Sequence, residues 1–216
     1  MFIELVDDLR CPRPHEETWL VASADRTEGR DIVEGTLGCP VCRAEYPIRR
    51  GVVWFADRAG AGSVEPAPPP PRADPEVSLR LAAFLDLSDG QGLALLAGSW
   101  ARHARPLGEL VVPTHLVLLN PDPPLDAGRG LSVLEASAAI PLADATCRGV
   151  ALDDAHADAA HLTAAVRVLR PRGRLVAPAA VAVPPGVTEL ARDDRLWVAE
   201  RAAAPPKLVT LQGRGG

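Results

Sequence analysis

The stretch Leu93-Ala94-Leu95-Leu96-Ala97-Gly98-Ser99-Trp100-Ala101-Arg102 decides the fold of this chain. Its first five residues are apolar without alternation, which is typical of a parallel strand buried on both faces. Gly98 ends the run, and the residues from Ser99 to Arg105 predict a helix. A buried strand that leads directly into a helix is the repeating unit of an α/β fold.

The same alternation of helices and buried strands continues through the second part of the chain. Residues 76–87 and 157–169 carry apolar side chains at helical spacing. Further strands are expected at 116–119, 131–134, 149–152 and 174–177, and an antiparallel pair at 196–198 and 208–211 would close the sheet. We therefore predict an α/β doubly wound, Rossmann-like sheet.

The first part of the chain is organised around three cysteines. Cys39 and Cys42 form a Cys-Pro-Val-Cys knuckle, and Cys11 opens a second arm that reads Cys-Pro-Arg-Pro-His. A Cys-x-x-Cys pair points two thiolates at one ion, and tetrahedral zinc accepts thiolate and imidazole ligands. His15 is the nearest residue able to complete the shell, so we predict a structural zinc site formed by Cys11, His15, Cys39 and Cys42.

Other interpretations of these residues remain open at this point. The thiols could be reduced and uncoordinated, two of them could form a disulfide, or the knuckle could be a redox pair. The competitors of His15 for the fourth position are Glu16, Glu17 and water. Because strands expected at 18–22, 31–37, 46–48 and 52–55 enclose little apolar area, a bound metal would supply folding energy and not catalysis.

A stretch rich in glycine and proline separates the two parts. It contains Gly60-Ala61-Gly62 and the run Pro68 to Pro71, and consecutive prolines favour an extended spacer. We therefore divide the chain into a zinc ribbon at 1–55, a linker at 56–75, a sheet domain at 76–200 and a final strand with a loose tail at 201–216. The acidic polar stretch between the first two strands is expected to be a loop.

Composition limits the functions that the chain can have. Its 216 residues are 47% hydrophobic and 24% charged, with a net charge of −5, which is ordinary for a globular protein and does not favour nonspecific binding to nucleic-acid phosphate. Arg49 and Arg50 form a local basic spot that could contact RNA. No signal peptide and no apolar run of about 20 residues is evident, so we expect a cytoplasmic protein without membrane contact.

Residues 3–55 resemble the small zinc-ribbon family of tRNA-methyltransferase activators. The similarity is carried by Leu9-Arg10-Cys11-Pro12, by residues 35–42 (Gly-Thr-Leu-Gly-Cys-Pro-Val-Cys) and by residues 46–52 (Tyr-Pro-Ile-Arg-Arg-Gly-Val). The resemblance implies a zinc-stabilised adaptor that binds methyltransferase catalytic subunits and does not itself catalyse. The chain departs from the family at Pro14, where the family places its second cysteine.

Residues 77–200 resemble a class I methyltransferase domain. The best matches are residues 140–145 (Ile-Pro-Leu-Ala-Asp-Ala) and 166–176, which contain Arg-Val-Leu-Arg-Pro-Arg-Gly-Arg-Leu-Val. The resemblance implies S-adenosylmethionine as cofactor, held by a glycine-rich turn after the first strand, because glycine lets the backbone approach a ligand closely.

The positions that should hold this cofactor carry other residues. Trp100 and Arg102 occupy the later glycine places of the turn, Leu96 replaces an acidic residue, and Asn120 stands where a carboxylate would grip the ribose. The strand-three position reads Ala136-Ser137-Ala138, and Arg148 with Gly149 replaces an acidic-aliphatic pair. An indole would fill the space of the nucleoside, so we expect no S-adenosylmethionine binding and a pseudoenzyme with no catalytic residues.

A second cluster of polar residues follows the fourth strand of the sheet. Asp153 and His156 could lie close together in one cleft, at the edge where α/β sheets bind ligands. His161 falls five residues later, which separates it from His156 by about 140° on a helix and argues against a shared ligand face. The simpler interpretation is that Asp153 and Asp154 cap the following helix.

These observations lead to a main hypothesis and two alternatives. The main hypothesis is a noncatalytic adaptor or scaffold that works through protein contacts, with a methyltransferase or a translation-related protein as partner. The first alternative is an active S-adenosylmethionine-dependent methyltransferase fused to its own activator, in which Asp122 or Asp144 holds the cofactor. The second is a ribbon that binds RNA through Arg49 and Arg50.

Overall fold

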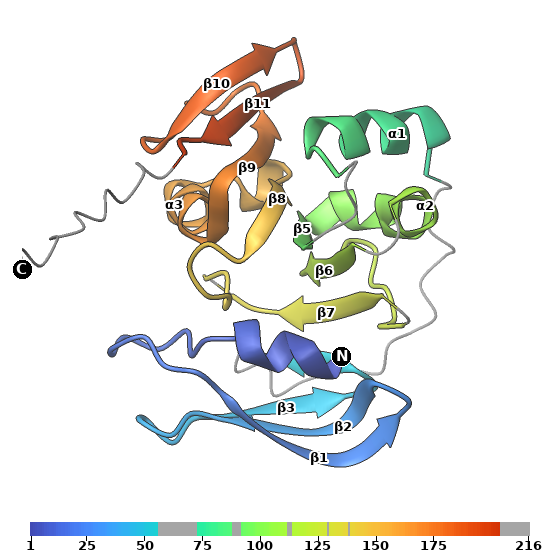
Figure 1. The fold of residues 1–216 in the computed structure, drawn as a ribbon, viewed down its shortest axis with the longest axis vertical. Coiled ribbons are helices and arrows are strands. Elements are labelled where there is room, and N and C mark those ends of the chain that lie inside the picture. The colour runs from blue at the N-terminus through green and yellow to red at the C-terminus, as the bar shows by residue number, and fades with distance from the viewer. Residues whose placement is uncertain (56–72, 88–91, 112–113, 129, 138, 204–216) are drawn as a thin grey trace, which may run out of the picture.

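The computed structural model describes residues 1–55, 73–87, 92–111, 114–128, 130–137 and 139–203. Within them, all eleven strands join in one sheet, in the order β1-β2-β3-β4-β7-β6-β5-β8-β9-β11-β10. Figure 1 shows the N-terminal strands at one end of this sheet and the β10–β11 pair at the other.

The middle of the sheet is parallel and follows the predicted buried strands. Its members are β5 (Leu93–Ala97), β6 (His115–Leu119), β7 (Leu131–Glu135), β8 (Cys147–Ala151) and β9 (Leu169–Pro178). Numbered in chain order, these five strands lie as 3-2-1-4-5, which is the order of a doubly wound Rossmann-type sheet. The α/β fold class predicted from the sequence is confirmed.

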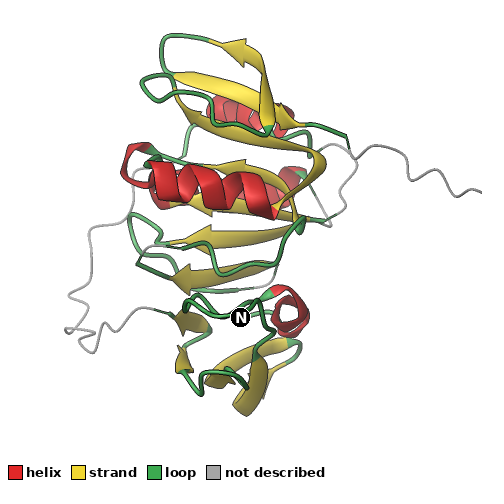
Figure 2. Ribbon diagram, turned by 90° about the vertical axis from the view of Figure 1, so that its left-hand side faces the viewer, coloured by secondary structure: helices red, strands yellow, loops and turns green. Residues whose placement is uncertain are grey.

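Helices cover both faces of the parallel strands (Figure 2). Helix α1 (Pro75–Phe84) and helix α2 (Ala104–Leu110), the latter preceded by the 3₁₀ helix η2 (Gly98–His103), pack together, and α3 (Ala159–Val168) lies across the sheet from them. The side chains of β5 alternate between two core clusters. Leu93 and Leu95 pack with the α3 side, and Ala94 and Leu96 pack with the α1 and α2 side.

The N-terminal part is a small antiparallel sheet that continues into the parallel one. A 3₁₀ helix, η1 (Ile3–Asp8), precedes β1 (Val21–Glu28), β2 (Asp31–Gly38), β3 (Glu45–Arg49) and β4 (Val52–Trp54). Strand β4 is antiparallel to β3 and parallel to β7, with Val53 opposite Leu134. Both edges of β4 are therefore occupied, one by its own ribbon and one by the large sheet.

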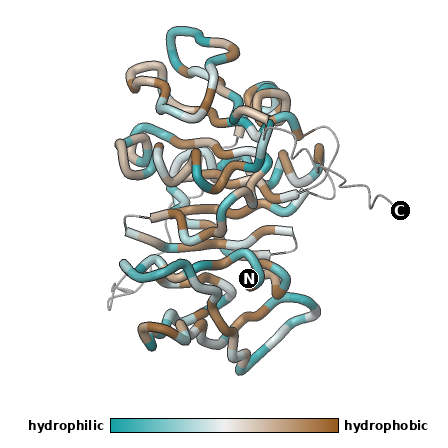
Figure 3. The backbone as a smooth tube through the Cα atoms, turned by 60° about the vertical axis from the view of Figure 1, so that its left-hand side comes forward, coloured by the Kyte–Doolittle hydropathy of each residue, from teal (hydrophilic) through white to brown (hydrophobic). Residues whose placement is uncertain are grey.

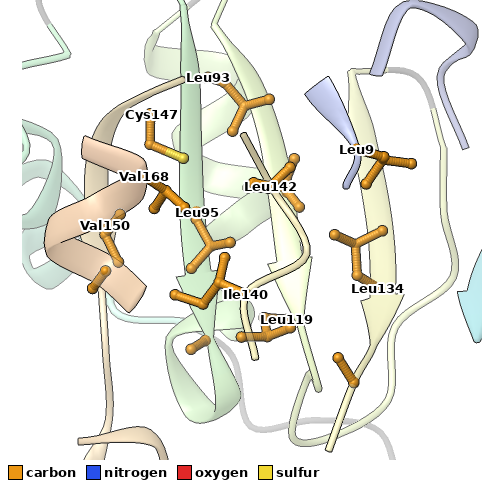
Figure 4. Packing of buried hydrophobic residues seen from close by; sticks show 14 of the residues in the cluster. Leu9, Leu93, Leu95, Leu119, Leu134, Ile140, Leu142, Cys147, Val150 and Val168 are labelled. Atoms are coloured by element: carbon orange, nitrogen blue, oxygen red, sulfur yellow. The ribbon is translucent and has the colours of Figure 1, made fainter. Parts of the chain in front are cut away.

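The ribbon also shares its core with the large sheet. Leu9 is fully buried, forms a bridge with Leu142 and lies next to Leu134 in Figure 4. The N–H of Arg10 donates to the carbonyl of Pro141 at 3.0 Å. Figure 3 shows hydrophobic stretches running through the central strands. Burial of these apolar side chains, at about 25 cal/mol per Å², holds the two parts together.

Two local predictions were wrong. The polar stretch expected to be a loop forms most of β1, because its backbone pairs with β2 regardless of its exposed side chains. The partner of β11 (Leu196–Arg201) in a closing hairpin is β10 (Val187–Arg192), and β9 flanks its other side. The strand predicted at 208–211 and the Pro68–Pro71 run lie outside the described residues.

Candidate functional site

The four predicted metal ligands lie together at one end of the ribbon. Their donor atoms all fall within 4.8 Å of one another. The Sγ atoms of Cys11 and Cys42 are 3.7 Å apart, and Nε2 of His15 lies 3.5 Å from Sγ of Cys39. Tetrahedral zinc, with Zn–S of about 2.3 Å and Zn–N of about 2.0 Å, requires S···S and S···N separations of about 3.8 and 3.5 Å. The donor set fits this ion.

The knuckle is shaped by backbone hydrogen bonds after the end of β2. The N–H of Cys39 donates to the carbonyl of Ala44 at 2.9 Å, and Arg43 adopts a φ of 56° that turns the chain back. Burial raises the pKa of Cys39, but hydrogen bonds from the backbone N–H groups of Cys42 and Val41 outweigh it and lower that pKa to about 7. At Cys39 the fold therefore favours the thiolate, the form that binds metal, whereas burial raises the pKa of Cys11.

His15 is oriented by its own neighbourhood. Its Nδ1 lies 2.6 Å from the carbonyl oxygen of Glu16, so Nδ1 carries the proton and donates. The lone pair of Nε2 then faces Cys39. Histidines that bind metal through one ring nitrogen commonly donate from the other to a carbonyl in this way. Glu17, a competitor for the fourth position, pairs with Arg10 at 3.4 Å.

Tyr46 is a further residue of this centre that sequence reasoning missed. Its hydroxyl oxygen lies 3.2 Å from Sγ of Cys11, and the ring is buried. Burial and the bond with Cys11 raise the pKa of Tyr46, so the phenol keeps its proton and can donate it to a Cys11 thiolate. The Tyr-Pro-Ile stretch predicted only a strand, because nothing in its pattern indicates a contact with a residue 35 positions earlier.

The second candidate site lies at the carboxyl end of the parallel strands, where this fold class binds ligands. The crevice lies between β5 and β8, the point at which the strand order reverses. Trp100 in η2, just after β5, donates from its indole nitrogen to the carbonyl of Leu152, just after β8, at 3.1 Å. The indole thus bridges the ends of β5 and β8.

Arg102 does not share this position. Its Nε donates to the carbonyl of Ser99 within the same turn, and its side chain lines a separate hollow with Asp74 and His103. Of the two side chains predicted to exclude a nucleoside, only that of Trp100 spans the strand ends.

A chain of hydrogen bonds links the ends of four strands. Asp153 accepts from the backbone N–H of Ser99 at 2.7 Å and from Nδ1 of His156 at 2.7 Å. Nε2 of His156 accepts from Nδ2 of Asn120 at 3.2 Å. Asn120 also exchanges two bonds with the backbone of Ala136, at 2.7 and 2.8 Å. We call this set the edge network. Each of its side chains is satisfied by the others.

The edge network also explains the glycine that remains in the turn. Gly98 has a φ of 56°, and a Cβ at this position would collide with the carboxylate of Asp153. Burial raises the pKa of Asp153, but the hydrogen bonds from His156 and Ser99 outweigh it and lower that pKa to about 2. An ionised carboxylate therefore stands directly beside the turn after β5.

The structure corrects the interpretation of the acidic cluster. Helix α3 is capped by Asp158, which accepts from the N–H groups of Ala160 and His161, and not by Asp153 or Asp154. The rings of His156 and His161 meet edge to face at 5.5 Å, because His156 lies in a 3₁₀ turn before the helix begins. The prediction that they diverge was wrong.

The carboxylates proposed as cofactor ligands in the active-enzyme alternative have other positions. Asp144 precedes β8, at the opposite edge of the sheet, and pairs with Arg167 at 2.8 Å. It cannot reach a ligand in the crevice, so this part of the alternative is wrong. Asp122 is exposed next to the turn, where its N–H donates to the carbonyl of Gly98.

A hollow of about 440 Å³ remains beside Trp100. It lies between α1 and the ends of β8 and β9, and the turn between β10 and β11 completes its wall. Its lining mixes apolar side chains with charged ones: Leu81, Phe84 and Leu196 with Arg80, Asp154 and Arg195. Its volume falls within the range of about 300–1,000 Å³ that small-molecule sites have.

The remaining candidate groups are part of the core. His103 bonds to Ser78 at 2.9 Å, and His115 bonds to Ser132 at 3.0 Å and stacks on Phe2. Burial lowers the pKa of His115 to about 4 and raises the pKa of Cys147. The two histidines are thus hydrogen-bonded within the fold, and Cys147 is a small buried side chain. Among the described residues, no helix is both long and apolar enough to span a bilayer.

Comparison with known proteins finds similarity only at the level of structure. No protein-family model matches the sequence, and a search of curated proteins finds no match. The antibiotic-resistance methyltransferase Kmr aligns with 59% of this chain and 93% of its own, at 17% identity and a TM-score of 0.42. A Burkholderia thailandensis 1,6-didemethyltoxoflavin-N1-methyltransferase aligns with 59% of this chain and 77% of its own, at 13% identity and 0.44.

A third structure is a complex between the Haloferax volcanii Trm112 methyltransferase activator and a putative methyltransferase. It aligns with 47% of this chain and 55% of its own chain, at 16% identity and a TM-score of 0.33. With TM-scores of this size, the fold assignment rests on the strand order of the sheet. The chain has a doubly wound, Rossmann-like α/β sheet, with a Cys/His group near its N-terminus that could hold a metal ion.

Proposed function

We propose that this protein is a noncatalytic scaffold, in which a zinc ribbon completes a methyltransferase-like sheet that no longer binds S-adenosylmethionine. The observation that carries the proposal is the edge network together with Trp100. The polar groups at the ends of β5, β6, β7 and β8 bond to one another, so a nucleoside would have to replace several satisfied bonds.

The side chain at the ribose position supports this proposal in detail. Asn120 donates from Nδ2 both to the carbonyl of Ala136 and to His156, and its oxygen accepts from the N–H of Ala136. Both N–H groups of this amide, and one of the two lone pairs of its oxygen, are therefore used within the protein. The side chain also carries no charge, so it cannot offer a ribose the bidentate grip of a carboxylate.

The metal site has a structural role in this proposal. Cys11, His15, Cys39 and Cys42 would hold one zinc ion and leave no open position for a substrate. When bound, zinc would supply folding energy to the ribbon. Because both edges of β4 are paired, a protein partner would use another surface of the molecule.

Calorimetry of the purified chain with S-adenosylmethionine tests the absence of cofactor binding. We expect no binding at millimolar ligand for the unmodified protein. Trp100→Gly and His156→Ala together should open the crevice, and this variant serves as a positive comparison if it gains measurable affinity. Micromolar binding by the unmodified chain would contradict the proposal.

The alternative of an active methyltransferase with a cis-fused activator is favoured by one observation, the hollow of about 440 Å³ beside Trp100. In this alternative the cofactor would enter the hollow from the α1 side, next to Asp154. It predicts that Asp154→Ala abolishes binding of S-adenosylmethionine, whereas Asp144→Ala, at the opposite edge of the sheet, leaves it unchanged. The same calorimetry decides between the two functions.

A further inference from the structure

Two aromatic rings connect the metal centre to the junction between the ribbon and the large sheet. Tyr46 on β3 contacts Cys11 through its hydroxyl, and its ring lies 4.9 Å from the ring of Phe55, at an angle of 45°. Such a tilted pair is worth about 0.5–1.5 kcal/mol beyond its buried area. One side chain thus touches a metal ligand at one end and a neighbouring ring along its side.

Phe55 is fixed to the large sheet by its backbone. It follows β4 directly, and its N–H donates to the carbonyl of Glu135, at the end of β7, at 2.7 Å. The next residue, Ala136, belongs to the edge network through its two bonds with Asn120. The position of Phe55 therefore affects how closely the end of β4 lies against the end of β7.

We propose that Tyr46 is a positioning residue that couples zinc occupancy to the pairing of β4 with β7. A bound ion would fix Sγ of Cys11, the hydroxyl of Tyr46 would be held by this sulfur, and its ring would hold Phe55 against the end of β7. This inference rests on the zinc binding proposed above and is independent of whether S-adenosylmethionine binds.

The competing explanation is that Tyr46 only fills the core of the ribbon. Its side chain is 4% exposed, so packing alone would account for a large loss of stability on truncation. Tyr46→Phe separates the two roles, because it keeps the ring and its contact with Phe55 and removes only the hydroxyl. Phe55→Leu does the reverse, since it keeps the hydroxyl bond to Cys11 and removes the ring contact.

Zinc binding and the pairing of β4 with β7 are thermodynamically linked in this proposal, so the zinc affinity of Phe55→Leu is a decisive measurement. If zinc stabilises the junction, then the junction must stabilise zinc by the same factor. Phe55 belongs to none of the four ligand positions, yet its replacement should weaken zinc affinity. Loss of the hydroxyl that contacts the sulfur of Cys11 should have the larger effect on zinc affinity, within the range of about 10–100-fold known for partners of metal ligands.

The experiment uses the full chain and zinc alone. Zinc affinity is measured by competition with a chromophoric chelator, and hydrogen exchange of segments 52–55 and 131–136 is followed with and without one equivalent of zinc. We expect Tyr46→Phe to weaken zinc affinity at least tenfold, and Phe55→Leu about threefold. Both should lose most of the zinc-dependent protection of segment 52–55. Trp19→Phe, an exposed aromatic of the ribbon, is the matched control and should change neither quantity.

The outcomes separate this inference from the proposed zinc site. If the unmodified chain binds no zinc, the metal site itself is wrong, and the coupling with it. If the chain binds one zinc but both variants match the unmodified affinity and protection, then zinc binding stands and the coupling is overturned. Should Phe55→Leu fold poorly, Tyr46→Phe decides alone, because it keeps the packed ring.

Discussion

The ribbon and the carboxyl edge of the parallel sheet both gather polar side chains from distant parts of the chain, but with opposite results. In the ribbon, four donor atoms converge within 4.8 Å around a point that a metal ion fits. At the sheet edge, Asp153, His156 and Asn120 converge on one another and on the backbone. The donor atoms of the first group could meet on one ion, whereas the polar groups of the second bond to one another.

This difference teaches that a cluster of ionisable residues is not in itself a binding site. What matters is whether the lone pairs and protons of the cluster are already used. Three thiols and an imidazole cannot satisfy one another well, because sulfur is a weak hydrogen-bond partner. A carboxylate, an imidazole and an amide can, and a satisfied buried network is costly to open.

Loss of one metal ligand should have the largest effect on stability, because it should prevent zinc binding to the ribbon. Cys39→Ser should abolish stoichiometric zinc binding and lower the melting temperature by about 10 °C. Loss of the metal removes several kcal/mol of folding free energy, and each kcal/mol corresponds to about 2–4 °C in a protein of this size. Metal analysis and calorimetric melting measure this. Cys147→Ala, a buried cysteine outside the site, should keep one zinc per chain. Full zinc content in Cys39→Ser would refute the assignment.

His115 provides a pH test where the ribbon meets the sheet. Its folded pKa of about 4 lies below the unfolded value of 6.5, so the unfolded chain binds more protons between these two pH values. Stability should therefore fall by up to about 3 kcal/mol as the pH drops from 6.5 to 4. His115→Phe, which keeps a ring against Phe2, should flatten this part of the profile in denaturant titrations. If His115→Phe has the same pH profile of stability as the unmodified protein, then other titrating groups cause the pH dependence.

Opening the edge network should have a smaller effect. Asn120→Ala leaves the N–H and carbonyl of Ala136 without their partners, which should cost about 2 kcal/mol in the free energy of unfolding. Asp122→Ala, an exposed neighbour, is the control and should cost less than about 0.5 kcal/mol. Equal effects of the two changes in urea titrations would mean that the network does not close the site.

The smallest effect concerns the helix that follows the network. Asp158→Ala removes the N-cap of α3 and should destabilise the protein by about 1 kcal/mol. Asp154→Ala should leave the stability unchanged, because this residue does not cap the helix. The reverse order of the two effects would restore the capping role that the sequence suggested for Asp154.

Much of the metal site could be predicted from the sequence. The spacing of Cys39 and Cys42 determines a knuckle by short-range geometry, and Cys11 and His15 supply the right donor atoms. The partner of Cys11 at Tyr46 could not be found, because the contact depends on how β3 packs against a segment 35 residues away. The tautomer of His15 likewise depends on a local carbonyl that only the coordinates reveal.

The sequence by itself determined the α/β alternation, because apolar runs such as Leu93–Ala97 are too short for a buried helix and end at a breaker such as Gly98, which favours strands buried on both faces. It also determined that Trp100 would stand at the turn after the first strand. The tertiary structure decided that β4 joins β7 and that Asp153, His156 and Asn120 close the sheet edge. The reason is physical: the hydrogen bonds of the edge network join groups up to 54 residues apart, and the bond beside β4 joins Phe55 to Glu135. No local pattern of apolar residues specifies which strand ends will meet.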